Sequence, residues 1–265
     1  AGVRRVEAPV SVEVTGCVPE VRVVDADSVA AILENGRGRA EYCDLAVLDF
    51  ASFVNPGGGY IRGAWAQEEA LCSESFLYNV LESQRDWYGE NRRRNINCEL
   101  YRNRGLVVPK VRFARDKIHA YADVLVIAAP NARRAREEYG VKEGVLERAM
   151  RERIRFALDV VDMLGHKKVV LGAWGCGVFG WDADTVAELF REELARGTHA
   201  IELAIFAISR NRFNENLQHF EHAFAAFPEK NAVSYAEAAA ERAAAAAEAE
   251  AQEEDEEEDD WRKYL

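Results

Sequence analysis

The sequence lacks the features of a membrane, secreted or disulfide-bonded protein. No window of the 265 residues approaches the run of about 18 apolar residues that a membrane span requires. The opening segment AGVRRVEAPVSVEV contains no apolar block of signal-peptide length, which predicts a cytoplasmic protein. The 5 cysteines are widely spaced without a C-x-x-C pair, which indicates reduced thiols. The 5 histidines form neither an H-E-x-x-H motif nor a cluster with cysteine, so the sequence predicts no metal site.

The net charge of −12 is unevenly distributed along the chain. Residues 234–265 hold twelve acidic and three basic side chains, so the preceding body carries a net charge of only −3. Within that body, residues 85–117 carry ten Lys or Arg against four Asp or Glu. Such a basic stretch is typical of a solvated loop, and it is also a candidate for steering an anionic ligand.

Composition changes after Pro228, where the chain turns to Ala/Glu repetition and then to eight consecutive acidic residues. Ala and Glu favour helix, but a face made of alanine buries little surface and blocks of like charge repel one another. We therefore predict a main domain over residues 1–230, with an N-terminal extension, and a helical or disordered acidic tail over residues 231–265.

Within the main domain, short apolar runs rich in β-branched residues alternate with helical patterns. This alternation predicts an α/β fold, with a layered sheet flanked by helices on both faces. In such sheets ligands bind beyond the carboxyl ends of the strands. The expected strands cover residues 21–27, 45–50, 123–130, 166–174 and 201–209, and the expected helices cover residues 28–34, 66–81, 142–164 and 184–196.

A glycine-rich loop, Asn55-Pro56-Gly57-Gly58-Gly59, follows the strand expected over residues 45–50. Three consecutive glycines suit a chain that takes positive φ or comes very close to another group. Their consecutive N–H groups can also cradle a phosphate. A plain flexible turn explains the glycines equally well, so this loop alone does not identify a site.

Gln67, Glu68 and Glu69 open the helix expected over residues 66–81. The helix dipole favours acidic residues in a first turn, and it favours their ionised form. Burial and a neighbouring carboxylate act in the opposite direction. An acid catalyst at this place therefore requires a buried site.

A second glycine-rich loop lies between a strand and the helix expected over residues 184–196, and it contains G-x-G-x-x-G at Gly175, Gly177 and Gly180. This pattern is typical of a loop that places a pyrophosphate at a helix N-terminus. The loop falls late in the chain, and Glu202 stands at the start of the next strand, which argues against NAD as the ligand. The sequence has no G-x-x-x-x-G-K-[ST], which argues against a P-loop nucleotidase.

These segments occur in an order that resembles the microbial-type poly(ADP-ribose) glycohydrolases. The matching motifs are DFAS (49–52), NPGGG (55–59), QEE (67–69) and LGAWGCGVF (171–179), and the resemblance extends across about residues 20–228. It implies a macrodomain-like mixed sheet and a glycosidase of the DNA damage response. Such an enzyme hydrolyses the ribose–ribose O-glycosidic bonds of poly(ADP-ribose), carried by ADP-ribosylated proteins, and releases ADP-ribose from the chain end.

The resemblance also implies roles for individual residues. Glu69 is the implied catalytic acid/base, Glu68 orients ribose hydroxyls and Asn55 holds the distal ribose. One carboxyl group can protonate the leaving oxygen and then activate water, so we expect neither a cofactor nor a metal ion. The other implied substrate-binding residues are Gly57, Gly58 and Gly59 in the catalytic loop, Gln67, and Gly175, Cys176, Gly177, Val178 and Phe179 in the diphosphate loop.

Several features leave alternatives open. Trp181 stands where the family usually has asparagine, a departure expected to change affinity but not the reaction class. Phe213 is either an adenine-stacking or a core residue, and Asp25 and Asp27 are either adenine partners or turn residues. A non-catalytic ADP-ribose-binding macrodomain and a hydrolase of mono-ADP-ribosylated proteins remain alternative functions, whereas a nicotinamide-dependent oxidoreductase is the least favoured.

Overall fold

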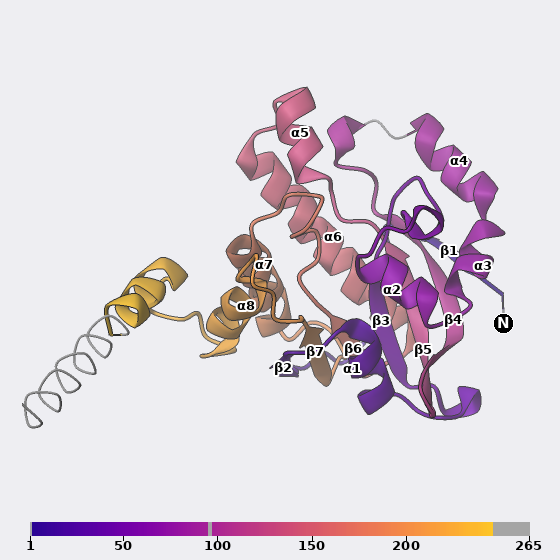
Figure 1. Cartoon of the computed structure of the whole chain (residues 1–265), viewed down its shortest axis with the longest axis horizontal. Coiled ribbons are helices and arrows are strands. Elements are labelled where there is room, and N and C mark those ends of the chain that lie inside the picture. Colours follow the sequence, from indigo (N-terminus) through magenta and orange to yellow (C-terminus); the bar gives the residue numbers. More distant parts are fainter. Residues whose placement is uncertain (1, 95–96, 246–265) are drawn as a thin grey trace, which may run out of the picture.

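The computed structural model describes residues 2–94 and 97–245, and these are built around one mixed sheet of 7 strands (Figure 1). The strands are β1 (Arg4–Glu7), β2 (Glu20–Val24), β3 (Leu45–Phe50), β4 (Arg104–Arg115), β5 (Ile118–Ile127), β6 (Lys168–Leu171) and β7 (Leu203–Ala207). Their order across the sheet is β1-β4-β5-β3-β6-β7-β2. From β5 to β2 all neighbours pair in parallel, whereas β4 is antiparallel to both β5 and β1. This topology confirms the predicted mixed α/β sheet.

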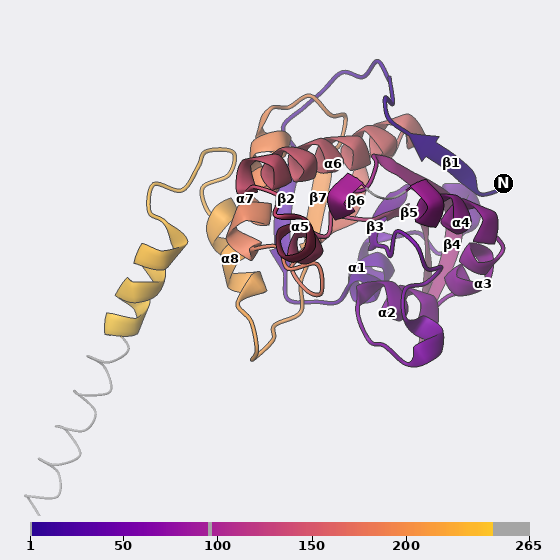
Figure 2. The same ribbon diagram turned by 90° about the horizontal axis from the view of Figure 1, so that it is seen from above.

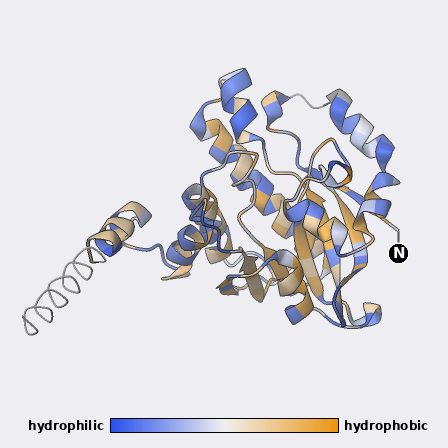
Figure 3. Cartoon of the chain, in the orientation of Figure 1, coloured by the Kyte–Doolittle hydropathy of each residue, from blue (hydrophilic) through white to orange (hydrophobic). Residues whose placement is uncertain are grey.

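The central strands are apolar along their whole length because both faces of the sheet are covered. In β3, Leu45 and Val47 pack on one side of the sheet, whereas Ala46 and Leu48 pack on the other. Figure 3 shows the consequence, with hydrophobic strands in the middle and hydrophilic helix surfaces outside. A register shift by one residue would exchange the two faces, so this pattern fixes how β3 lies between β5 and β6.

Helices cover the sheet in two layers, as predicted (Figure 2). One layer is dominated by the long helix α6, whose residues Met150, Ile154, Ala157 and Val161 recur at helical spacing and are buried. The first layer holds α5 (Ala132–Tyr139), α6 (Glu143–Leu164), α7 (Ala183–Ala195) and α8 (Asn216–Phe224), and the second holds α1 (Ser28–Asn35), α2 (Gln67–Ser73), α3 (Leu77–Glu82) and α4 (Arg85–Arg94).

Two parts of the sequence prediction were wrong. The single helix expected over residues 66–81 is two helices, α2 and α3, because Ser75 interrupts the backbone ladder. Its hydroxyl donates to the Leu71 carbonyl at 2.6 Å and accepts from the Leu77 N–H at 3.1 Å. The basic stretch 85–117 is also not a loop, since it contains α4 and the whole of β4.

At the C-terminal side, residues 235–245 form a helix that leads away from the sheet (Figure 1). Tyr235 attaches its start to α8, because its ring lies 3.7 Å from that of His219. Residues 246–265, most of the predicted acidic tail, lie outside the described residues. All five cysteines carry free thiols, as the sequence predicted. None of the described helices is long and apolar enough to cross a bilayer.

Candidate active site

The two glycine-rich loops meet at the carboxyl ends of the parallel strands. β3 ends at Phe50, β6 ends at Leu171, and the two strands are neighbours in the sheet. The loops that follow these strands therefore line a common cavity of about 360 Å³, which we call the catalytic cavity. All predicted site residues except Gly57 and Cys176 line it. The other lining residues are Phe50, Ser52, Arg62, Ala64, Ala66, Ala173 and Trp174.

Gln67 ties the start of α2 to the end of β3. Its side-chain oxygen accepts a hydrogen bond from the Phe50 N–H at 2.9 Å. Its amide nitrogen donates to the Leu48 carbonyl at 2.9 Å and to Ser28 Oγ at 3.1 Å. Because one amide group supplies both donors and an acceptor, glutamine can bridge a strand end in this way. Gln67 thus positions the two carboxylates that follow it, and its contact with a substrate stays a prediction.

Glu68 is buried, and only one of its carboxylate oxygens has a partner among the described residues. Oε2 accepts a hydrogen bond from the Ser52 N–H at 2.8 Å, whereas Oε1 is buried without one. Burial, and next the negative charge of Asp49, raise the pKa of Glu68 well above its usual range. The sequence could not decide whether burial or the helix dipole dominates here, and for Glu68 burial does.

Glu69 is buried as well, but backbone N–H groups bind both of its oxygens. The Gly59 N–H donates to Oε1 at 2.7 Å, and the Ala66 N–H donates to Oε2 at 3.2 Å. The bond from Ala66 closes the first turn of α2, as a glutamate at the third helical position commonly does. The bond from Gly59 connects the helix to the triple-glycine loop. The Oε2 contact is the longer one, so Oε2 makes the weaker of the two hydrogen bonds.

The triple-glycine loop lies so close to both carboxylates that no side chain fits. A Cβ atom on Gly58 would lie 2.6 Å from Oε1 of Glu69 and 2.7 Å from Oε2 of Glu68. The φ angles of Gly57 and Gly58 are +63° and +61°, a region that favours glycine. The predicted need for glycine is confirmed, and the close neighbours are the site's own glutamates.

A third carboxyl group, that of Asp49, lies near the two glutamates at the end of β3. The side chain is fully buried, and neither of its oxygens has a partner among the described residues. Burial, and next the charge of Glu69, raise the pKa of Asp49 well above its usual range. The sequence carries no signal for a role of Asp49, because it does not show that this end of β3 is buried.

The diphosphate loop holds its shape through its own backbone and leaves a row of N–H groups unpaired. The Gly180 N–H donates to the Gly177 carbonyl at 3.0 Å, which closes a turn. Within the described part of the chain, the N–H groups of Gly177, Val178 and Phe179 donate to no protein acceptor. Consecutive free N–H groups of this kind form an anion-binding concavity. The loop therefore has the geometry expected for a diphosphate.

The side chain of Trp181 packs against this loop from the protein interior. Its ring is buried, and its Nε1 donates to the Pro130 carbonyl at 2.7 Å. A Cβ atom on Gly175, whose φ is +81°, would lie 2.6 Å from the Trp181 ring. At the position where the resemblance leads us to expect a polar side chain, this loop thus has the buried ring of Trp181. The thiol of Cys176 likewise turns away from the catalytic cavity and contacts the Trp174 carbonyl at 3.9 Å.

Asn55 is held in place by an arginine of the basic stretch. The Nη2 atom of Arg92, on α4, donates to Oδ1 of Asn55 at 2.7 Å. This bond leaves the side-chain NH₂ group of Asn55 available for a ligand. Sequence reasoning missed Arg92 as a positioning residue, and its only signal was membership of the basic stretch.

A second cavity of about 390 Å³, here the side cavity, shares Phe50, Ala66, Gln67 and Ala173 with the catalytic cavity. It contains no lysine or arginine, and its wall includes the exposed ring of Trp65. Sequence reasoning missed Trp65. The polar side chains that line the side cavity are those of Asp27, Ser28, Gln67, Ser209, Asn211, Asn214 and Asn216.

The candidate adenine residues are mostly engaged elsewhere. Asp25 accepts hydrogen bonds from the N–H and Nε of Arg210 at 2.7 and 3.2 Å. Asp27 caps α1 through the Ala30 N–H at 2.8 Å, and it also pairs with Arg115. Phe213 is 79% exposed, which excludes a core role.

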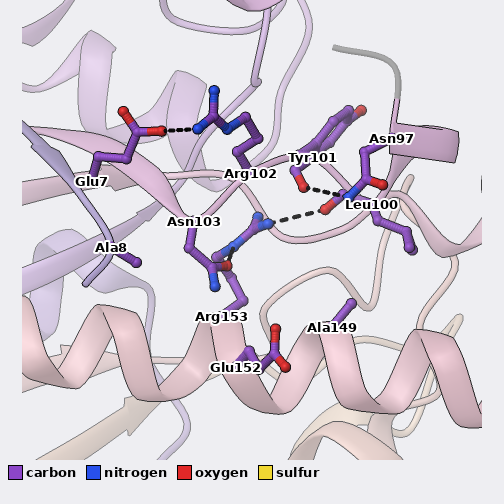
Figure 4. Close-up of a pocket in the computed structure, with 10 residues that line it drawn as sticks. All are labelled: Glu7, Ala8, Asn97, Leu100, Tyr101, Arg102, Asn103, Ala149, Glu152 and Arg153. Carbon is purple, nitrogen blue, oxygen red and sulfur yellow. Dashed lines mark hydrogen bonds and ion pairs between the residues drawn. The ribbon is translucent and has the colours of Figure 1, made fainter. Parts of the chain in front are cut away.

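Arg153 of α6 anchors the segment that precedes β4 (Figure 4). Its guanidinium is buried and has no carboxylate partner among the described residues. It donates to Asn103 Oδ1 at 2.6 Å, to the Leu100 carbonyl at 3.0 Å and to the Ala128 carbonyl. Burial lowers the pKa of Arg153 to about 9, a cost that these hydrogen bonds offset. Arg153 thereby joins α6, the end of β5 and residues 97–103.

This anchored segment presents an aromatic ring to the site. The ring of Tyr101 stacks on Phe53 with centroids 4.4 Å apart, and it meets the edge of Phe179 at 6.3 Å. The φ angle of Tyr101 is +63°, which is uncommon for a residue with a side chain and indicates local strain. The strained turn and the bonds from Arg153 together support Phe179, which lines the catalytic cavity.

One group of described residues has the spacing of metal ligands, and it lies outside the catalytic cavity and the side cavity. Asp159, Asp162 and His199 bring their ligand atoms within 4.8 Å of one another. Burial would lower the pKa of His199, but its hydrogen bond to Asp162 and the nearby Glu193 raise it to about 9. Because metal binding requires a neutral imidazole, we interpret the group as a buried ion-pair network.

The sequence as a whole was compared with known families and proteins. The family described as microbial-type PARG, catalytic domain, where PARG denotes poly(ADP-ribose) glycohydrolase, matches residues 6–116. This segment contains the triple-glycine loop and Gln67-Glu68-Glu69. No curated protein matches significantly.

Solved structures match over most of the chain. The PARG from Thermomonospora curvata is 29% identical with a TM-score of 0.70, covering 83% of this chain and 84% of that one. The same enzyme bound to the inhibitor ADP-HPD gives 28% identity and a TM-score of 0.71, covering 84% of this chain and 85% of that one. The PARG from Deinococcus radiodurans in complex with ADP-ribose is 32% identical with a TM-score of 0.68, covering 77% of this chain and 84% of that one.

The family match contains the loop and carboxylates of one wall of the catalytic cavity, and the structural matches extend over more than three quarters of the chain. Both matches agree with the resemblance read from the sequence. The chain therefore belongs to the microbial-type poly(ADP-ribose) glycohydrolase family.

Proposed function

We propose that this protein is a glycosidase that hydrolyses the ribose–ribose O-glycosidic bond of poly(ADP-ribose) and releases ADP-ribose from the chain end. The observation that carries the proposal is the hydrogen bond from the Gly59 N–H to Oε1 of Glu69 in the catalytic cavity. It fixes a carboxyl group in a cavity that is also lined by the unpaired N–H groups of residues 177–179. One ligand can thus meet both a carboxyl group for proton transfer and N–H groups for anion binding, as a sugar attached to a diphosphate requires.

In this proposal the diphosphate of the terminal unit binds the N–H groups of Gly177, Val178 and Phe179. The distal ribose then lies between the two loops, within reach of Asn55 and Glu68. Adenine occupies the side cavity, which lacks basic side chains and offers Trp65 as an apolar surface. Binding energy from the diphosphate and the adenosine holds the scissile bond against the glutamates.

Glu69 acts as acid and then as base. Its Oε2 proton passes to the leaving oxygen, the 2′-oxygen of the preceding ribose, while the bond from C1″ to that oxygen breaks. The distal ribose becomes oxocarbenium-like. The Glu69 carboxylate then takes a proton from the water that attacks C1″, which restores the carboxyl group and yields ADP-ribose. Glu68 orients the ribose hydroxyls.

These steps need only protein groups, so we propose that hydrolysis is independent of magnesium and other metal ions. The free thiols of all five cysteines suit a reducing compartment, which supports a cytoplasmic location. Turnover of the polymer on ADP-ribosylated proteins after DNA damage is the process that the family resemblance supports.

The test is incubation with purified poly(ADP-ribose) at neutral pH in the presence of a chelator, with products separated by chromatography. We expect free ADP-ribose as the main product from the earliest time points. Shorter polymers without ADP-ribose would contradict cleavage from the chain end, and no product from a folded sample that binds ADP-ribose would indicate a non-catalytic reader. A mono-ADP-ribosylated protein in parallel identifies the alternative hydrolase, since only that enzyme would release ADP-ribose faster from it than from polymer.

A further inference from the structure

A third cavity, which we call the arginine cleft, adjoins the catalytic cavity. It has a volume of about 280 Å³ and shares Asn55, Gly58 and Arg62 with the catalytic cavity. Asn55 and Gly58 belong to the triple-glycine loop, so the cleft opens where the predicted scissile bond would lie. The remaining lining residues are Pro56, Ile61, Tyr78, Glu82, Arg85, Tyr88, Gly89 and Arg92.

The cleft concentrates positive charge. Its lining includes three arginines and a single acidic residue, Glu82. Arg85 pairs with Glu82, whereas Arg92 donates to the neutral side chain of Asn55. Arg62 is exposed and forms no ion pair with any described residue. At least two guanidinium groups are therefore not neutralised by the carboxylates that the structure describes.

The three cavities are arranged in a row. The side cavity and the arginine cleft each share lining residues with the catalytic cavity, but they share none with each other. If the terminal adenosine occupies the side cavity, its distal ribose faces the glutamates and the chain leaves toward the arginine cleft. The basic lining thus lies at the end of the row where the polymer continues, with Arg62 at its border with the catalytic cavity.

We propose that the arginine cleft binds the diphosphate of the preceding ADP-ribose unit, the one that carries the leaving 2′-oxygen. This inference rests on the proposed function and deepens it, because it adds a subsite for the polymer beyond the terminal unit. A diphosphate carries two negative charges, and guanidinium groups form paired hydrogen bonds with phosphate oxygens. Arg62, which has no ion pair among the described residues, makes this contact together with the N–H groups of Arg85 that its Nη2 bond to Glu82 leaves free, and Arg92 contributes charge while it positions Asn55.

The basic stretch 85–117 contributes to this cleft through two of its arginines. Several of its arginines are engaged elsewhere: Arg115 pairs with Asp27 and Glu74, Arg102 pairs with Glu7, and Arg104 pairs with Glu90. Of the members of the stretch, Arg85 and Arg92 line the cleft. Arg85 and Arg92 therefore bring part of the positive charge of this stretch to the cleft beside the site.

The test compares polymer hydrolysis with ADP-ribose binding in Arg85→Glu and Arg62→Gln. We expect the KM for poly(ADP-ribose) to rise ~5-fold or more at low salt and to approach the wild-type value at high salt, because exposed charges are screened. The dissociation constant of Arg85→Glu for free ADP-ribose should stay within ~2-fold, since Arg85 does not line the catalytic cavity. The matched control is Arg148→Glu, which makes the same charge change at an exposed position of α6.

The outcomes separate the subsite from the proposed function. Absence of ADP-ribose release by the wild type would overturn the proposed function itself. Normal release with an unchanged KM in Arg85→Glu would overturn only the subsite. An equal rise in KM with Arg148→Glu would indicate general charge steering instead of a cleft. An equal rise with a mono-ADP-ribosylated protein, which has no preceding unit, would show that the cleft recognises the carrier protein and would also refute the assignment.

Discussion

The two glycine-rich loops of the site are supported differently. The triple-glycine loop is attached to α2 through side-chain carboxylates, above all by the bond from the Gly59 N–H to Glu69. The diphosphate loop is supported by turns within its own backbone and by the packed ring of Trp181. The first loop therefore uses the Gly59 N–H to hold the Glu69 side chain, whereas three consecutive N–H groups of the second have no acceptor among the described residues.

This difference has a chemical consequence. A change at the first loop disturbs the geometry of the acid/base, since the loop and the carboxylate share hydrogen bonds. In the proposed function, a change at the second loop would alter binding of the diphosphate and leave the carboxylates where they are. Chemistry and anchoring are thus assigned to separate walls of one cavity, and substitutions can test that separation.

The largest expected effect is that of Glu69→Gln. We expect kcat to fall ~10³-fold, because the amide cannot supply or accept the proton in the reaction. Its side-chain oxygen can still accept from the Gly59 N–H, so affinity for ADP-ribose should stay within ~3-fold. Rapid-quench kinetics and calorimetric titration measure the two quantities. Parallel losses of binding and turnover would mean that the carboxylate has a structural role.

Gly58→Ala should reduce kcat/KM by ~10²-fold, because the added methyl group would displace both glutamates. Backbone strain also contributes, since the φ of Gly58 is +61°. The matched control is Gly63→Ala, where φ is +74° but a Cβ atom would meet no neighbour within 4 Å. Similar losses of activity in the two variants would assign the effect to strain and weaken the comparison of the loops.

Asp49→Asn tests whether the carboxyl group near the first loop is neutral. Since the folded protein holds the Asp49 proton more tightly than the unfolded chain, the unfolding free energy falls as pH rises above the ordinary Asp pKa. The variant lacks this contribution, so its loss of stability between pH 5 and pH 8 should be smaller by at least ~1 kcal/mol, or ~3 °C in Tm. Thermal denaturation at both pH values provides the measurement.

Trp181→Phe is the control for that experiment at the second loop. It removes the hydrogen bond from Nε1 to the Pro130 carbonyl without changing a titratable group. We expect a loss of ~1 kcal/mol that is the same at both pH values. A pH-dependent loss would show that the two loops are coupled.

Gly177→Ala should have the smallest effect. A Cβ atom there would meet no neighbour within 4 Å, and the residue does not need positive φ. We expect Tm to change by less than ~2 °C and affinity for ADP-ribose by less than ~3-fold, because the backbone N–H groups are retained. A large drop in Tm in differential scanning calorimetry would show that the diphosphate loop is as tightly packed as the triple-glycine loop.

The sequence predicted the elements whose hydrophobic pattern is simple. The bounds of β3 and of α6 were predicted to within a residue. A strand buried on both faces is apolar throughout, and a helix buried along one stripe has apolar residues at helical spacing. β4 was missed because Pro109, Lys110 and several arginines interrupt its pattern. Its pairing with β5 supplies the missing determinant, since Leu106 to Val108 lie opposite Val124 to Val126.

At the site, the sequence identified the groups and not their environments. Gln67, Glu68 and Glu69 could be located from their spacing after the triple glycine. Glu68 and Glu69 differ because the fold brings different backbone N–H groups to their carboxyl groups. The complete burial of Asp49 likewise depends on tertiary packing. The contact between Arg92 and Asn55 joins residues on different elements, and local pattern carries no signal for such a pair.

Two cysteines lie beside the loops, and the burial of their thiols affects the reactivity of these groups. Sγ of Cys72 lies 3.3 Å from where a Cβ atom on Gly57 would be, and burial raises the pKa of the Cys72 thiol. Burial also raises the pKa of the Cys176 thiol behind the other loop. Because thiolate is the form that reacts with peroxide and alkylating agents, both thiols are chemically quiet. Neither thiol is therefore expected to be a nucleophile of the site, and both loops are packed against cysteines that stay in the neutral form.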